Sequence, residues 1–162
     1  MTATPMIPFN FAVAFFQDGT PVPLCNGAFS EVSGLEATHE PKAIREGGRY
    51  GGEIQRAGQI THATVILKRG MTGGPDLWNW FRLMGEGNIA ARLRVVVTLY
   101  GPEGAGGEPR LTWVLHRALP TKFRAATFAA NAAEIGIEEI HLVHEGMDLE
   151  ISGAPTAGEA TA

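Results

Sequence analysis

Two segments of the chain alternate apolar and polar side chains with a period of two, the pattern of a β-strand that has one buried face. The apolar side chains of residues 91–100 share one face: Leu93, Val95, Val97 and Leu99. Residues 60–69 alternate in the same way, with Val65 and Leu67 on the apolar side. On a helix, a period of two would scatter the apolar and polar side chains around the axis, whereas on a strand it separates them onto two faces. The pattern therefore predicts a sheet with a buried core.

The rest of the chain extends this pattern to about seven strands and one helix. Twenty-one glycines and ten prolines punctuate the sequence and favour turns between short strands. Leu77, Trp80, Phe81 and Met84 recur at helical spacing and predict a helix over residues 76–84. The other expected strands are 9–16, 28–32, 37–44, 111–119, 122–128 and 135–143. The expected fold class is mainly β, an antiparallel β-sandwich or barrel with one short α-helix.

The length of 162 residues suits one domain with a hydrophobic core. We expect this domain to span residues 1–150. The final segment, residues 151–162, is small and polar and is expected to be a flexible tail.

Charge and composition exclude several classes of protein. The net charge of −4 argues against a general nucleic-acid binder, which carries a basic excess. The N-terminal segment lacks a basic region and does not read as a signal peptide. No apolar run approaches the roughly 20 residues that a membrane helix needs. Synthesis in the cytoplasm is therefore the expectation.

The residues that could carry chemistry do not form a recognisable active site. His141 and His144 are the only histidines close in sequence, and a spacing of three places them on opposite faces of a strand. Cys25 is the single cysteine, and no neighbouring residue would lower the pKa of its thiol. Glu138 and Glu139 are adjacent, so a strand sends them to opposite faces. We expect no enzyme, no metal and no cofactor.

Charge is distributed unevenly near the C-terminus. Residues 110–124 contain four Lys or Arg and no acid, whereas residues 131–150 contain six acids and no Lys or Arg. These segments are either ordinary solvated faces or complementary edges that meet in an assembly.

The stretch IREGGRYGG, residues 44–52, lies in a long connection, residues 45–59, between two expected strands. Long connections in compact domains tend to be functional. Its glycines match neither the GxxxxGK[ST] nor the GxGxxG phosphate-binding pattern, and no helix follows to receive a phosphate. A substrate and another copy of the chain remain open as its partner.

Five motifs occur in a specific order: FSEVSGLEATHE, IREGG, ATVILKRGMTGGPDLWNW, WVLHRALPTKF and IGIEEIHLVHEGM. Together they resemble the tail tube proteins of contractile phages and, more closely, the inner tube proteins of extracellular contractile injection systems, which are phage tail-like particles. The resemblance runs from about Phe9 to Met147. It implies a structural protein whose six copies close into a ring around a continuous inner β-barrel.

The resemblance also implies partners. Stacked hexameric rings form a tube within a contractile sheath, and the tube delivers cargo held in its lumen. The implied partners are further copies of the chain, the sheath protein, baseplate and tube-terminating proteins, and the cargo. No specific nucleic acid is implied, and no membrane insertion by a transmembrane segment. Such a particle is a virion component or is released from the cell.

Three groups of residues take roles by the same resemblance. The connection that would dock on the neighbouring ring contains Arg45, Glu46, Gly47, Gly48, Arg49, Tyr50, Glu53 and Arg56. The helix offers candidates for contact with another subunit or the sheath, namely Trp78 and Arg82. Candidates for lining the lumen are His62, Thr64, Lys68, Arg92, Arg94 and Thr98.

Two alternatives are left open. A tube initiator or baseplate adaptor would share the fold and bind a different partner on one face. A small-molecule-binding β-barrel would belong to another class and would need a convergent polar pocket, of which the sequence gives no sign.

Overall fold

The computed structural model describes residues 10–20, 25–27, 29–48, 50–131 and 133–152. Strands dominate, every pairing is antiparallel, and the described residues contain one α-helix. The expected mainly β class is therefore confirmed. The elements outside the arm described below are β1 (Phe11–Gln17), β2 (Cys25–Gly27), β3 (Phe29–Ser33), β6 (Val65–Gly70), α1 (Asp76–Gly85), β7 (Leu93–Tyr100), β8 (Pro109–Arg124), β9 (Ile137–Val143) and β10 (Gly146–Ile151).

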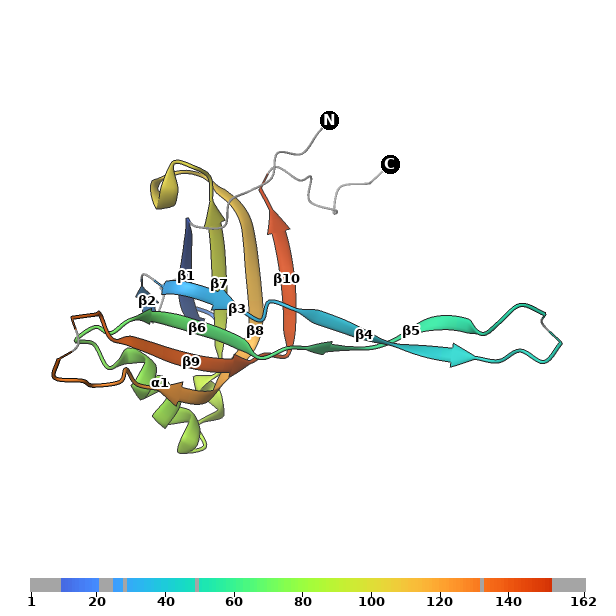
Figure 1. The fold of residues 1–162 in the computed structure, drawn as a ribbon, viewed down its shortest axis with the longest axis horizontal. Helices are drawn as coiled ribbons and strands as arrows, with labels where there is room; N and C mark the ends of the chain where they lie inside the picture. Colours follow the sequence, from blue (N-terminus) through green and yellow to red (C-terminus); the bar gives the residue numbers. More distant parts are fainter. Residues whose placement is uncertain (1–9, 21–24, 28, 49, 132, 153–162) are drawn as a thin grey trace.

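A single path of hydrogen-bonded strands, β2-β1-β7-β8-β9-β6-β3, folds into two layers (Figure 1). Strand β8 makes this possible because its 16 residues belong to both layers. Its first part pairs with β7 and β10, and residues 119–124 pair with β9. The largest buried side chains lie between the layers: Phe15, Leu67, Leu77, Leu115, Ile140 and Leu142.

The sequence predicted a break at Pro120, and that prediction is wrong. Strand β8 continues through Pro120, which lies opposite Leu142 of β9 beside a register shift. Pairing with β7 ends at Ala118, so the strand edge on that side carries no ladder bond that a proline would remove. Pro120 thus sits where β8 passes from one layer to the other.

Helix α1 closes the end of the sandwich. Leu77 and Trp80 are buried, and the Trp80 ring meets the Phe15 ring edge-on at 5.3 Å between centroids. The Trp80 indole N–H donates to the Ala91 carbonyl at 2.6 Å. Phe81, expected on the same stripe, is half-buried and stacks on Trp78, which remains 47% exposed. The helical stripe read from the sequence therefore faces the core through Leu77 and Trp80.

A long two-stranded ribbon projects from the sandwich between β3 and β6 (Figure 1). Strands β4 (Ala37–Ile44) and β5 (Ile54–His62) pair only with each other. We call residues 37–62 the arm. The expected connection over residues 45–59 is therefore too long: β5 begins at Ile54, opposite Ile44, and the turn is residues 45–53.

Strand β10 was not expected. It pairs with the first part of β8, placing Met147 opposite Leu115 and Leu149 opposite Trp113. This strand ends at Ile151, at the expected start of the C-terminal tail. Residues 153–162 lie outside the described part of the chain.

Candidate assembly surfaces

The arm is exposed along both of its strands. Every residue of β4 is exposed, and most of β5 is as well. At the turn, the Arg45 Nε donates to the Glu53 carboxylate at 2.6 Å and joins the two strands. Gly48, Gly51 and Gly52 have positive φ, a conformation that side chains disfavour, so the turn needs its glycines.

The other expected docking residues also lie on the arm. Glu46, Gly47 and Gly48 are in the exposed turn, and Arg56 is exposed on β5 opposite Lys42. Arg49 falls outside the described residues. All the expected docking residues that the structure describes therefore lie on the arm, in its turn or on β5. The arm has no core of its own.

A histidine pair lies where the arm joins the sandwich. The rings of His62, the last residue of β5, and His144, just after β9, are 4.7 Å apart between centroids. His144 donates from Nδ1 to the Gly146 carbonyl at 2.9 Å. The His62 Nδ1 and His144 Nε2 atoms are buried and have no hydrogen-bond partner among the described residues. Burial lowers the pKa of His144, and the nearby His62 and His116 lower it further.

This pair predicts a stability that depends on pH. Since the folded-state pKa of His144 lies below its ordinary value of 6.5, the unfolded chain binds the proton first. We expect the free energy of unfolding to be retained above about pH 6.5 and to fall as the pH drops below it. Urea unfolding at pH 7.5 and 5.5 measures the loss. A His144→Asn variant can still donate to Gly146 and should lose less; an equal loss would contradict the assignment.

Charged side chains form a row across one outward face. Glu31 of β3, Lys68 of β6, Glu139 of β9 and Arg124 of β8 are consecutive cross-strand partners, so the signs alternate. The Lys68 ammonium donates to Glu31 at 3.1 Å. A hydrogen bond from His141 lowers the pKa of Glu139, and the charges of Lys68 and Arg124 lower it further. This outward face is therefore charged, with alternating signs.

The expected lumen residues are divided between several places. Lys68 belongs to the charged row, whereas Arg94 and Thr98 lie on β7 and face outward from the other layer. Arg92 forms an ion pair with Glu145, and Thr64 is exposed between β5 and β6. His62 is the half-buried histidine at the root of the arm. These residues therefore lie on several elements of the subunit, and their place at the lumen stays a prediction.

The basic segment 110–124 and the acidic segment 131–150 partly contact each other within one subunit. Arg117 of β8 pairs with Glu145 at 2.8 Å, and His116 contacts Asp148 of β10 at 2.6 Å. Arg124 lies opposite Glu139. Complementary edges therefore exist, but these neighbours belong to the same chain.

An ion cluster that sequence reasoning missed ties α1 to the sandwich. Arg69 of β6 is 3% exposed and bonds to Glu138 of β9 and to Asp76 at the start of α1. It also lies over the Phe29 ring at 5.6 Å. The signal was present, since Arg69 continues the buried positions of Val65 and Leu67. These bonds and charges hold the pKa of Arg69 well above its ordinary value, although burial alone would lower it.

The described residues contain no group of three or more His, Cys, Asp or Glu placed to hold a metal ion. In the same residues, no helix has the length and apolar character to cross a membrane.

Comparison with known proteins gives a family and a fold. The model of a family described as T4-like virus tail tube protein gp19 matches residues 7–148. Among solved structures, a chain of the anti-feeding prophage baseplate is 27% identical over 94% of this chain and 100% of that one, with a TM-score of 0.77. No curated protein sequence matches the chain.

Two more distant structures share the fold. A chain of the sheath-tube complex of the extracellular contractile injection system PVC is 22% identical, with a TM-score of 0.75 over 91% of this chain and 92% of that one. Hcp1 from Flavobacterium johnsoniae is 11% identical, with a TM-score of 0.51 over 87% of this chain and 94% of that one.

Proposed function

The chain belongs to the family of T4-like virus tail tube proteins, and from this premise we propose that it is the inner tube subunit of a contractile injection system or phage tail. In this proposal, six copies close into a ring and the rings stack around a central channel that carries cargo. The role is structural, and the chain performs no chemistry. Residues 1–150 act as one domain.

The observation that carries the proposal is the arm. A two-stranded ribbon alone in water is marginally stable, because it has no face buried in a core. An arm that projects from the sandwich with both strands exposed is therefore stabilised best by a partner that covers it. Stacking each ring on the next supplies such a partner for every copy.

The strand edges suit ring closure. Strand β3 ends the hydrogen-bonded path on one side, and residues 119–124 of β8 lie beyond the last residue paired with β7. Unpaired edges favour association, and a monomer must protect them. Pairing of edges between copies would use these backbone groups in a closed, head-to-tail ring.

The assemblies that contain similar chains favour a second role on the same fold. One neighbour is a chain of a baseplate, and two others come from tube-terminating assemblies. A baseplate adaptor or terminator would bind its own kind within one ring and a different protein on the ring face. The sheath, baseplate, terminator and cargo are partners in either role, and the particle is assembled in the cytoplasm.

Negative-stain electron microscopy of the purified protein, with its mass measured in solution, tests the proposal. Hollow tubes of uniform width are the expected result for a tube subunit. Single rings that do not elongate at high concentration would favour the adaptor or terminator. A strict monomer, both alone and with a baseplate template, would contradict both roles.

Replacing Arg45 and Glu46 together by alanine should leave the fold intact and weaken tube growth. The substitution removes the Arg45–Glu53 ion pair at the turn and two charges that could meet a neighbouring ring. Exposed ion pairs contribute at most about 1 kcal/mol each, so unfolding should be nearly unchanged. Tube length by microscopy and unfolding by circular dichroism measure the two effects; tubes of normal length would contradict a role for these charges.

A further inference from the structure

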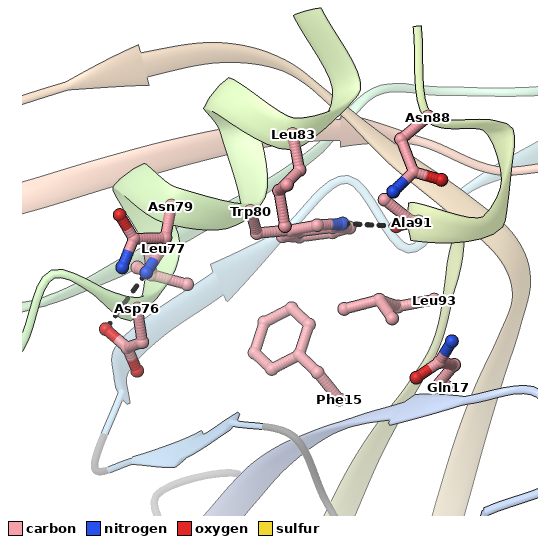
Figure 2. A pocket seen from close by; sticks show the side chains of 10 residues that line it. All are labelled: Phe15, Gln17, Asp76, Leu77, Asn79, Trp80, Leu83, Asn88, Ala91 and Leu93. Atoms are coloured by element: carbon pink, nitrogen blue, oxygen red, sulfur yellow. Dashed lines mark hydrogen bonds between the residues drawn. The ribbon is translucent and has the colours of Figure 1, made fainter. Parts of the chain in front are cut away.

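A cavity of about 380 Å³ opens between helix α1 and strand β1. Its apolar wall consists of buried side chains from three elements, and Figure 2 shows the rings of Phe15 and Trp80 close together with Leu93 beside them. Leu77 also lines it, and Leu83, which is partly exposed, stands on the helix above. Its volume falls within the range of about 300–1,000 Å³ that is typical of ligand pockets.

Polar groups also line the cavity, among them the amide of Asn88 just after α1. The Trp80 indole N–H is already bonded to the Ala91 carbonyl (Figure 2). Asp76 accepts hydrogen bonds from Arg69. Gln17 and Asn79 are exposed amides that also line the cavity. An amide can donate to or accept from a hydroxyl group. The cavity therefore suits an aromatic or aliphatic group that carries one hydroxyl.

The turn of the arm carries a side chain of this kind. Tyr50 is a fully exposed large hydrophobic residue, and it directly precedes Gly51 and Gly52, which have positive φ in the turn of the arm. A tyrosine combines a rigid ring with a hydroxyl, and it buries roughly 150–250 Å² when it enters an interface. Such residues are frequent anchors at interfaces, where they fill desolvated pockets.

We propose that Tyr50 of one copy fills the cavity between α1 and β1 of a second copy. This inference rests on the proposed function, because it requires copies that stack. The ring would contact Phe15, Trp80 and Leu93, and the hydroxyl would reach Gln17 or Asn79. The proposal thus assigns a receptor surface to the turn of the arm.

The geometry makes this contact intermolecular and repeating. In Figure 1 the arm projects to one side of the sandwich and α1 lies toward the other. The nine residues of β5 alone carry the turn roughly 30 Å from the sandwich, so Tyr50 lies out of reach of its own cavity. A protrusion at one end and a hollow at the other give a head-to-tail contact, which continues from copy to copy.

Photo-crosslinking tests the contact in the full-length protein. In a Tyr50→p-benzoylphenylalanine variant under assembly conditions, we expect cross-links to residues 76–93 of a second copy, identified by mass spectrometry of the dimer. The same probe at Gln55, exposed on β5, is the matched control and should not reach those residues. Tubes with cross-links from position 50 to another surface would overturn this inference and leave the tube proposal standing.

The reverse probe identifies what occupies the cavity. In an Asn79→p-benzoylphenylalanine variant, products with residues 45–53 of a second copy are expected. Products with residues 21–24 of the same chain would show that the chain fills its own cavity, and they would overturn the inference. Absence of any assembly, with or without a baseplate template, would overturn the tube proposal and this contact with it.

Substitutions give an independent measure. Tyr50→Ala should raise the protein concentration needed for tube growth at least about tenfold, as expected for an anchor residue. Tyr50→Phe keeps the ring and should have a smaller effect, because only the hydroxyl is lost. Ile60→Ala, on β5 near the root of the arm, should change it little. Equal growth of the Tyr50→Ala and parent proteins would contradict the inference.

Discussion

Arg69→Ala is expected to lower the free energy of unfolding by about 3–5 kcal/mol, the usual range when one partner of a buried ion pair is removed. The substitution leaves the Glu138 carboxylate nearly buried without its cation. It also releases Asp76, which the guanidinium holds at the start of α1. Both consequences act on the same junction of β6, β9 and the helix.

Urea unfolding at neutral pH measures this loss. Arg94→Ala is the matched control, because Arg94 lies over the Phe16 ring at 5.2 Å but is exposed on β7. It should cost at most about 1 kcal/mol. An Arg69→Met, Glu138→Leu double variant should be more stable than Arg69→Ala, because the nearly buried Glu138 charge is removed together with its cation. A loss below 1 kcal/mol for Arg69→Ala would mean that water reaches Glu138.

Replacing the arm by a tight turn should abolish tubes and leave the sandwich folded. His39 and Ile60 are paired, so an Asn-Gly turn in place of residues 40–59 joins them with the geometry of a two-residue hairpin. The removed residues pair with one another and are largely exposed, so the free energy of unfolding should change by about 0.5 kcal/mol or less.

Microscopy and sedimentation give the readout for this arm replacement. We expect monomers or single rings at concentrations where the parent protein forms tubes. Unfolding of the same sample, followed by circular dichroism, shows that the lost assembly is not lost folding. Hollow tubes of normal length from the shortened chain would contradict both the stacking role of the arm and the Tyr50 contact.

Alternation in the sequence predicted the strands that have one buried face. Strand β7 and most of β6 were predicted because Val65, Leu67, Val95 and Val97 are buried and their neighbours in the chain are not. The single strand expected over residues 60–69 is wrong in its bounds, because residues 60–62 belong to β5 and β6 begins at Val65. Residues 54–59 of β5 were not predicted as a strand, because they lack this alternation. Neither face of the arm packs on a core, so the arm does not require an apolar side chain at every second position.

The sequence predicted which segment takes part in assembly, but not which distant residues come together in the fold. The glycine-rich turn indicated where the arm bends. The cavity beside α1, however, combines the helix and β7 with β1, which lies far from both in the chain. His62 and His144 meet for a similar reason, since 82 positions separate them and only the fold brings them together. Pairs of this kind leave no local pattern. Arg69 is different, because a charged residue in a buried register could have been noticed.

The direction in which the arm leaves the sandwich has a mechanical consequence. The arm continues the line of β3 and β6 (Figure 1), so a force along it acts parallel to those strands. Strand β6 is held to β9 through six consecutive residue pairs, from Val65 opposite Leu142 to Gly70 opposite Ile137. Such a pull loads the ladder in shear, and its hydrogen bonds must fail together rather than one after another. A subunit pushed or pulled through its arm is therefore strongest along the axis of the arm and weakest across it.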